Sequence, residues 1–438
     1  SSAASDVYKR QQIEVVCALM FSPYIQEAEK IDILDPHYYE TAGWFYNNAD
    51  VYDKLPDDIP YKIYVGEYAA IGRPSLYSSL AEAAYLTGVE RNADKVQMVS
   101  YAPLIENAAH GKDHLLVLKN DSVYGRTNYY VLKMFSENRP DVNLHTDLKP
   151  ASPEPVFRTN GFIGLGTNNT EAQFKDLKVI VNGEEIYTSG WSDFVDKWTI
   201  IRGDWKMEGN LLSQSQKGID ALAILEDREF DDCTIELKAK KISGTEGFRI
   251  VFGGTDSNNY FMADIGSHTN ESVIFREVNN EGPISLFDYR NTASIKTDQW
   301  YTVRIEIEGA HWKCFLNDEL QYEYTYAPKK KHYVVSGYDR ERKEVIVKLV
   351  NAEAGNWKVR LQLDKAKNLA SKGTKIVLGA DDRFDENSFS DPLKIVPNVT
   401  ELSGISSEFT IDCQANSLTV LRLSLIHISE PTRRVVIS

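Results

Sequence analysis

The sequence predicts a multi-domain protein that combines an α/β part, half of a (β/α)8 TIM barrel, with all-β parts. Its 438 residues suffice for two to four folded units at roughly 100–200 residues per domain. Strand-like and helix-like stretches alternate about four times up to residue 139. Beyond Pro140, helical periodicity disappears and short alternating strands separated by Gly, Asn and Asp turns take over. We therefore expect a half-barrel followed by a jelly-roll β-sandwich and a second β-sandwich.

The α/β part, predicted over 12–139, consists of apolar, β-branched runs separated by stretches with helical spacing. Its strongest helix is expected over Ser75–Asn92, an Ala-, Leu- and Glu-rich segment with the pattern of an amphipathic helix. The expected strands are Ile13–Phe21, Ile31–Tyr39, Tyr61–Ala70, Val96–Leu104 and His114–Asn120, and the other expected helices are Tyr24–Ile31, Gly43–Leu55 and Asn128–Arg139.

The all-β part divides into two predicted sandwiches. The first, a jelly roll over 156–330, resembles a concanavalin-like, laminin-G-type module. The second is expected to begin with the first strand or strands in 140–155 and to be completed by 331–424. The two ends, 1–11 and 425–438, resemble translated linker sequence, so we treat them as non-native scars and expect them to lie outside the fold.

Composition excludes several classes of function. The 49 Lys and Arg residues against 64 Asp and Glu give a formal charge of −15, a poor match to nucleic acid. No apolar stretch approaches the roughly 20 residues of a membrane-spanning helix. The sequence has four cysteines, Cys17, Cys233, Cys314 and Cys413, and they form no metal-binding signature. We interpret them as core thiols, with a disulfide between Cys233 and Cys314 as the alternative.

The most informative residue is Glu67, because a carboxylate at the C-terminal end of a barrel strand lies on the face where such barrels perform catalysis. The segments around it, Lys62–Asn107 and Asp32–Asp53, resemble α-L-arabinofuranosidases of glycoside hydrolase family 51. Far downstream, Asp381–Leu423 resembles the end of the C-terminal sandwich of that family. The resemblance implies that the α/β part is the C-terminal half of the barrel and that 156–330 is an insertion.

Carried over to this sequence, the resemblance implies that Glu67, within Val65-Gly66-Glu67-Tyr68-Ala69, is the catalytic nucleophile. It also implies that His37 and Tyr39 line the sugar site. The alternative for His37 and Tyr39 is a structural cluster that packs the barrel rim. Retaining glycosidases need a second carboxyl group about 5–5.5 Å from the nucleophile. In this family it belongs to an Asn-Glu pair upstream, and no residue before Glu67 fills that role here.

We therefore expect a retaining exo-α-L-arabinofuranosidase that releases terminal arabinofuranose from arabinoxylan or arabinan, with the present chain inactive alone. The resemblance implies no metal or organic cofactor, arabinose-containing plant polysaccharides or oligosaccharides as partners, and a secreted or periplasmic location. Two alternatives remain: a non-catalytic carbohydrate-binding β-sandwich protein with a remnant barrel, and a β-xylosidase or endoglucanase of the same family. The inserted module reads as a carbohydrate-binding module or a spacer.

Overall fold

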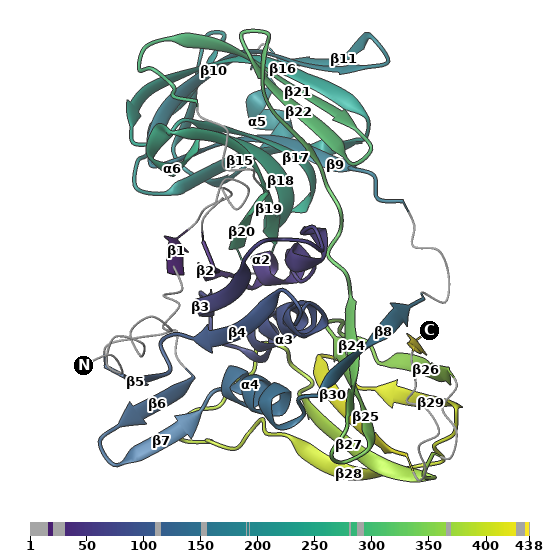
Figure 1. Cartoon of the computed structure of the whole chain (residues 1–438). Helices are drawn as coiled ribbons and strands as arrows, with labels where there is room; N and C mark the ends of the chain where they lie inside the picture. The colour runs from purple at the N-terminus through teal and green to yellow at the C-terminus, as the bar shows by residue number, and fades with distance from the viewer. Residues whose placement is uncertain are drawn as a thin grey trace, which may run out of the picture. The chain divides into compact units, whose positions relative to one another are not determined.

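The chain divides into two compact units. One unit comprises Ser1–Glu154 and Lys329–Ser438, and the other comprises Pro155–Pro328 (Figure 1). The computed structural model describes residues 16–20 (backbone only), 31–109, 115–149, 156–189, 191, 193–279, 282–286, 293–364, 369–425 and 434–437. The helix expected over Tyr24–Ile31 lies outside these residues.

The first unit contains a four-stranded parallel sheet in the order β1-β2-β3-β4. This sheet, with the helices that connect its strands, confirms the α/β prediction. The strands are β1 (Val16–Met20), β2 (Ile33–Thr41), β3 (Lys62–Ile71) and β4 (Val96–Tyr101), and the helices are α2 (Ala42–Asn47), the 3-10 helix η2 (Val51–Lys54), α3 (Leu76–Arg91) and α4 (Thr127–Glu137).

Helix α3 is fixed at its start by Ser75, whose side chain accepts a hydrogen bond from the Ser78 backbone in a capping box. The prediction that this helix is amphipathic is wrong, because every residue from Leu76 to Gly88 is buried. The physical reason is that α3 contacts strand β3 on one side and strands β24 (His332–Asp339) and β25 (Glu344–Asn351) on the other. A helix covered on both sides has no solvent-facing stripe.

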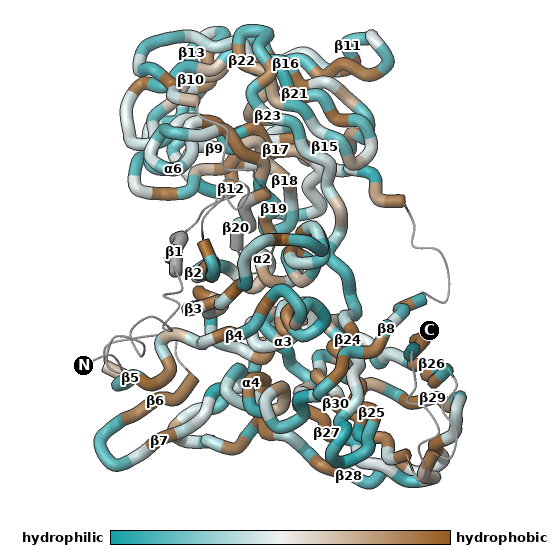
Figure 2. The backbone as a smooth tube through the Cα atoms, viewed as in Figure 1, coloured by the Kyte–Doolittle hydropathy of each residue, from teal (hydrophilic) through white to brown (hydrophobic). Residues whose placement is uncertain are grey.

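A small separate sheet corrects the expected barrel strand at His114–Asn120. Strand β6 (Leu116–Lys119) pairs with β5 (Ile105–Asn107) and β7 (Ser122–Gly125), not with the parallel sheet. Hydrophobic residues colour much of β6 brown in Figure 2, and Ile105 at the start of β5 is 52% exposed. An apolar run predicts a strand, but it does not tell which strand is its partner.

The rest of the first unit is a β-sandwich built from one continuous path of strands, β28-β27-β30-β25-β24-β8-β31-β26-β29. Its two parts pack over a shared hydrophobic core. Strand β8 (Val142–Leu148) precedes the second unit in the chain and pairs with β24, which follows it. The remaining strands are β26 (Trp357–Asp364), β27 (Lys372–Gly379), β28 (Asn398–Ser403), β29 (Glu408–Cys413), β30 (Ser417–Ser424) and β31 (Arg434–Ile437).

Strand β31 comes from the C-terminal tail that we expected to lie outside the fold. It pairs in parallel with β8 and antiparallel with β26, and Val435 and Ile437 are fully buried in the sandwich core. Its alternation of buried and partly exposed residues fits a strand that has one face on a core. The tail therefore takes part in the sandwich.

The second unit is a sandwich of two antiparallel sheets over one large core. One sheet runs β13-β14-β10-β16-β21-β22-β23, with β11 paired to β10, and the other runs β12-β15-β9-β17-β18-β19-β20. The elements are β9 (Gly161–Asn168), β10 (Thr170–Val181), β11 (Glu184–Ser189), α5 (Phe194–Lys197), β12 (Trp198–Arg202), β13 (Trp205–Glu208), β14 (Leu211–Gln214), β15 (Asp220–Phe230), β16 (Cys233–Gly244), β17 (Phe248–Asp256), β18 (Asn259–Gly266), α6 (Ser267–Asn270), β19 (Ser272–Asn279), β20 (Gly282–Leu286), β21 (Trp300–Glu308), β22 (His311–Leu316) and β23 (Glu319–Thr325).

The cysteines of this core are not bridged. Cys233 and Cys314 are both free and buried, as is Cys413 in the other unit. Burial raises the pKa of the Cys233 thiol to about 12. The possible disulfide between Cys233 and Cys314 is therefore absent, and the thiols act as small apolar side chains.

Candidate functional site

The three residues singled out in the sequence meet where β2 and β3 run side by side. The two strands are parallel, with His37 opposite Glu67 in the register. The Tyr39 hydroxyl donates a hydrogen bond of 2.7 Å to Glu67 Oε2, and His37 Nδ1 lies 3.5 Å from the same oxygen. The side chain of Glu67 is 42% exposed, whereas that of His37 is only 16% exposed. A partly exposed carboxylate thus has two neighbouring side chains beside one of its oxygens.

An irregularity in β3 orients Glu67. Between Ile63 and Tyr68, β3 contains one residue more than the facing stretch of β2. In an unbroken strand, Val65 and Glu67 would point to the same face. Instead, Val65 is fully buried in the hydrophobic core, Glu67 is accessible, and Tyr68 is fully buried with its ring 5.8 Å from that of Tyr85. The extra residue is a β-bulge, a feature that re-aims side chains.

Asp35 completes this cluster, although sequence analysis did not single it out. Its Oδ1 atom accepts a 2.8 Å hydrogen bond from the Gly66 backbone N–H and lies 3.3 Å from His37 Nε2. Because side chains alternate along a strand, Asp35, His37 and Tyr39 share one face of β2. That Asp-x-His-x-Tyr alternation was a signal that could have identified Asp35.

The tyrosines of β2 have different environments. Burial, reinforced by the hydrogen bond and the charge of Glu67, raises the pKa of Tyr39 to about 12. Tyr39 therefore stays protonated at neutral pH and remains a hydrogen-bond donor to the carboxylate. Tyr38 points to the opposite face, where its ring lies 4.9 Å from that of Trp44. Only Tyr39 reaches the candidate site.

A second, buried polar network supports the end of β3, and sequence analysis missed it as well. Glu82 of α3 is 2% exposed, and its Oε1 accepts hydrogen bonds from the Ala70 backbone N–H (2.8 Å) and the Tyr101 hydroxyl (3.2 Å). The Asn128 amide in turn donates to the Tyr101 hydroxyl. Burial raises the pKa of Glu82 to about 8. An acidic residue inside the Ala-rich Ser75–Asn92 helix was the available signal.

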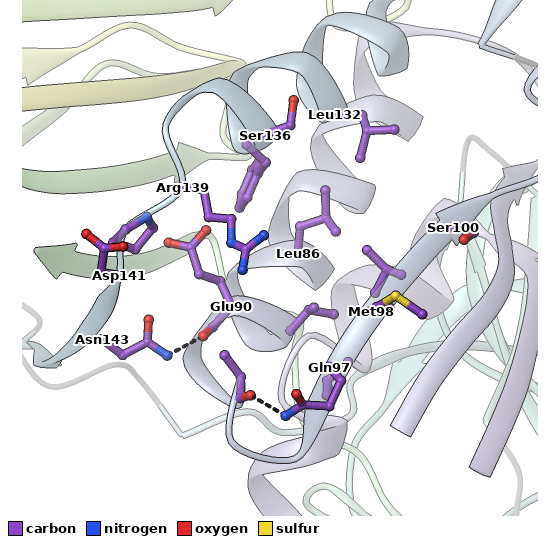
Figure 3. Close-up of a pocket in the computed structure, with 16 residues that line it drawn as sticks. Leu86, Glu90, Gln97, Met98, Ser100, Leu132, Ser136, Arg139, Asp141 and Asn143 are labelled. Carbon is purple, nitrogen blue, oxygen red and sulfur yellow. Dashed lines mark hydrogen bonds between the residues drawn. The ribbon is translucent and has the colours of Figure 1, made fainter. Parts of the chain in front are cut away.

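A pocket of about 580 Å³ lies away from Glu67, where α3, β4 and α4 meet (Figure 3). Its apolar lining includes Leu86, Val96 and Phe135, and Glu90 and Arg139 are among its polar lining residues. Met98 of β4 also lines the pocket and is 58% exposed. The described residues contain no group of three or more His, Cys, Asp or Glu side chains arranged to bind a metal ion. Among the described helices, none is long and apolar enough to cross a membrane.

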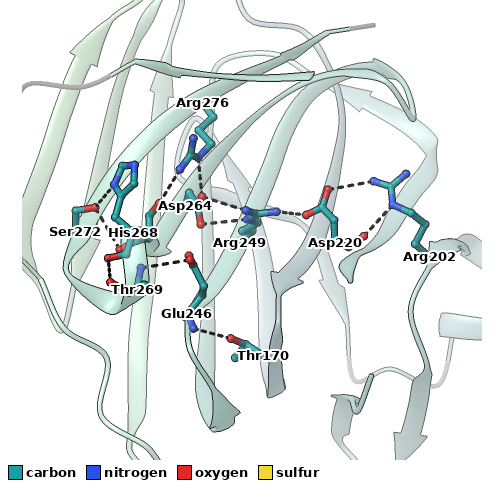
Figure 4. Close-up of polar contacts among 11 residues, drawn as sticks. Thr170, Arg202, Asp220, Glu246, Arg249, Asp264, His268, Thr269, Ser272 and Arg276 are labelled. Carbon is teal, nitrogen blue, oxygen red and sulfur yellow. Dashed lines mark hydrogen bonds and ion pairs between the residues drawn. The ribbon is translucent and has the colours of Figure 1, made fainter. Parts of the chain in front are cut away.

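The second unit carries a ladder of charged side chains across one of its sheets (Figure 4). Arg249 Nε and Arg276 Nε lie 3.1 Å and 2.7 Å from the two oxygens of Asp264. Arg249 also pairs with Asp220 across β9, where its neighbour in the register is Gly166, which has no side chain in the way. Burial alone would raise the pKa of Asp264, but the two arginines lower it. The buried charges are therefore paired within the sheet.

Comparison with known proteins identifies the family. The family described as the alpha-L-arabinofuranosidase C-terminal domain matches residues 66–417. The chain belongs to the α-L-arabinofuranosidases of glycoside hydrolase family 51. It is 29% identical over 399 residues to an extracellular exo-alpha-L-arabinofuranosidase of Streptomyces chartreusis, covering 90% of this chain and 47% of the relative. It is 31% identical over 225 residues to alpha-L-arabinofuranosidase 1 of Arabidopsis thaliana, covering 48% of this chain and 33% of the relative.

Solved structures of family 51 arabinofuranosidases also align with the chain. The arabinose-bound MgGH51 α-L-arabinofuranosidase aligns with a TM-score of 0.49 at 15% identity, covering 96% of this chain and 41% of that one. The arabinose complex of the Thermotoga maritima enzyme aligns with a TM-score of 0.45 at 11% identity, covering 94% and 58%. The chain thus spans about half the length of the Streptomyces arabinofuranosidase and a third of that from Arabidopsis.

Proposed function

We propose that this chain carries the nucleophile half of a retaining exo-α-L-arabinofuranosidase, with Glu67 as the nucleophile and His37 and Tyr39 as substrate-binding and orienting residues. The observation that carries the proposal is the hydrogen bond from Tyr39 to Glu67 Oε2, beside His37, on an accessible carboxylate. The naming of the Streptomyces relative as an exo-arabinofuranosidase supports the reaction type. Arabinose-containing plant polysaccharides or oligosaccharides are the proposed substrates.

The geometry suits a carboxylate that attacks through one oxygen. Tyr39 and His37 both face Oε2, whereas Oε1 has no hydrogen-bond partner within the described part of the chain. In the proposed first step, Oε1 forms a bond to the anomeric carbon while the glycosidic carbon–oxygen bond breaks, and the departing oxygen takes a proton from a general acid. In the second step the conjugate base of that general acid takes a proton from water. The water oxygen attacks the anomeric carbon, the bond from this carbon to Glu67 Oε1 breaks, and arabinose leaves with retained configuration.

We propose that the acid/base group lies upstream of this chain, which covers 47% of the length of the Streptomyces relative. We infer that β1–β4 are the C-terminal half of a (β/α)8 barrel and that this upstream region supplies the other half. In support, β4 pairs on one side only among the described residues, and the pocket beside it is lined by apolar Leu86, Val96 and Phe135. A strand and helix packed there would bury this lining and continue the sheet.

The inserted unit is proposed as a carbohydrate-binding module or a spacer, and the protein as secreted or periplasmic, in line with the extracellular relative. The alternative of a purely carbohydrate-binding protein is disfavoured by the accessible, oriented Glu67, because binding needs no exposed nucleophile. A β-xylosidase or endoglucanase of the same family remains the second candidate. Initial rates on aryl α-L-arabinofuranosides and β-D-xylosides decide between these specificities.

The deciding experiment compares Glu67→Ala with the parent, both produced with the upstream region of the longer protein. Loss of a nucleophile removes several orders of magnitude of turnover, each tenfold corresponding to about 1.4 kcal/mol. Sodium azide should restore part of the Glu67→Ala activity and give a glycosyl azide of inverted configuration, because a small anion fits the vacated space. Glu137→Ala, at an exposed glutamate of α4, serves as the control and should keep full activity. Near-normal turnover of Glu67→Ala would refute the assignment.

A further inference from the structure

We propose that Asp35 is a positioning residue for the nucleophile: it holds the Gly66–Glu67 backbone and the His37 ring with one carboxylate. This inference deepens the proposed function and rests on Glu67 being the nucleophile. Asp35 does not touch Glu67 itself, so its effect on catalysis passes through its two neighbours. Two contacts of Asp35 support this role, one with the Gly66 backbone and one with the His37 ring.

The first observation is the backbone anchor. The Gly66 N–H donates a 2.8 Å hydrogen bond to Asp35 Oδ1 at the bulge that turns Glu67 toward solvent. A bulge leaves one residue outside the regular strand ladder, and its backbone groups need other partners. Asp35, whose side chain is 13% exposed, is the partner that Gly66 finds. The anchor therefore fixes the peptide that precedes the nucleophile.

The second observation is the closeness of that contact. A Cβ atom at Gly66 would lie 2.3 Å from Asp35 Oδ1 and 2.9 Å from both Asp35 Cγ and Oδ2. Real Cβ atoms do not approach other heavy atoms that closely, so a side chain at position 66 would displace the carboxylate. Gly66 does not need a positive φ. The glycine is required here for space, and the space is occupied by Asp35.

The third observation is the imidazole between two carboxylates. His37 Nε2 lies 3.3 Å from Asp35 Oδ1, and Nδ1 on the other side of the ring lies 3.5 Å from Glu67 Oε2. A carboxylate oxygen beside one ring nitrogen favours one orientation of the imidazole, as carboxylates orient catalytic and metal-binding histidines. Asp35 thus helps to hold the His37 ring in the orientation in which Nδ1 faces Glu67.

The structural test uses this chain as it is. Val65-Gly66 is the only Val-Gly pair in the sequence, so labelling Val carbonyls with ¹³C and Gly nitrogens with ¹⁵N gives one cross-peak, that of the Gly66 amide. In Asp35→Ala the amide loses its acceptor, and its hydrogen exchange should accelerate by about tenfold or more. In Asp35→Asn the acceptor oxygen is kept, so exchange should change by less than about threefold. Asp58→Ala, at an exposed aspartate, is the control. Unchanged Gly66 exchange in a folded Asp35→Ala protein would overturn the anchor.

The catalytic test uses the chain with its upstream region and an aryl α-L-arabinofuranoside. Asp35→Asn keeps the anchor but removes the charge beside His37, and small misplacements of reacting groups cost on the order of 100-fold in rate. We expect kcat to fall about 10–100-fold with KM within about threefold, and no rescue by azide because Glu67 is intact. Full kcat in both Asp35→Asn and Asp35→Ala would overturn the positioning role. If Glu67→Ala retained turnover, the proposed function would fail instead, and the Gly66 exchange would still report on the anchor separately.

Discussion

Replacing Glu82 by glutamine should remove a large pH dependence from the stability of the first unit. Glu82 lies in the fully buried part of α3, and its Oε1 accepts hydrogen bonds from the Ala70 backbone and the Tyr101 hydroxyl. Glutamine offers the same acceptor oxygen without an ionisable group. The Glu82→Gln protein therefore mimics the protonated form of Glu82 at every pH.

The sign and size follow from the raised pKa. The ordinary value of 4.5 applies to the unfolded chain, whereas burial raises the pKa of Glu82 to about 8 in the folded unit. Between these two values the folded state holds a proton that the unfolded state has lost, so stability falls as pH rises. The stability that the proton on Glu82 contributes to the folded unit is fully present below about pH 4.5 and is lost by about pH 8. At about 1.4 kcal/mol per pH unit, the loss between pH 5 and pH 8 is roughly 4 kcal/mol.

The assay is urea unfolding at pH 5 and pH 8, read by a brief hydrogen-exchange pulse at one fixed pH on peptides from α3, which report the first unit alone. Relative to the parent, Glu82→Gln should gain roughly 4 kcal/mol on going from pH 5 to pH 8. Glu137→Gln, at an exposed position of α4, is the control and should follow the parent at both pH values. A Glu82→Gln protein with the same pH dependence as the parent would refute the reasoning, because Glu82 would then be ionised in the folded unit.

Three further predictions concern packing. Gly66→Ala should destabilise the first unit by about 1–3 kcal/mol in urea unfolding, and a second change, Asp35→Gly, should recover much of this; additive losses would show that the two residues do not collide. Lys348→Met should lower the free energy of unfolding by about 3–5 kcal/mol, because Glu90 would stay buried without its ion-pair partner. Adding Glu90→Gln should recover part of this loss, and an unchanged free energy of unfolding in Lys348→Met alone would contradict the prediction. The isolated Pro155–Pro328 unit should fold alone and unfold cooperatively, since it has its own core, and a random-coil circular dichroism spectrum would refute this.

The sequence by itself determined the elements that depend on local pattern. Periodicity separated the α/β part from the all-β part, and motif resemblance pointed to Glu67, His37 and Tyr39 before their strands were seen together. Period-two alternation along a strand also accounts for the opposite directions of Tyr38 and Tyr39 on β2, which their contacts show. The inferences about elements and strand faces succeed because a strand or helix imposes its period on its own residues, whereas the roles of Glu67, His37 and Tyr39 stay proposals.

Only the tertiary structure decided which elements meet. The bulge in β3 and the anchor from Asp35 to Gly66 depend on register between strands about thirty residues apart, which no local pattern encodes. The buried state of Glu82 depends on packing against both sides of α3, and β6 joined a sheet of its own because of its neighbours rather than its composition. The C-terminal tail became strand β31 for the same reason: β8 and β26 offered it backbone partners and a core to cover. Local propensity sets what a segment can form, and burial and pairing with distant segments set what it does form.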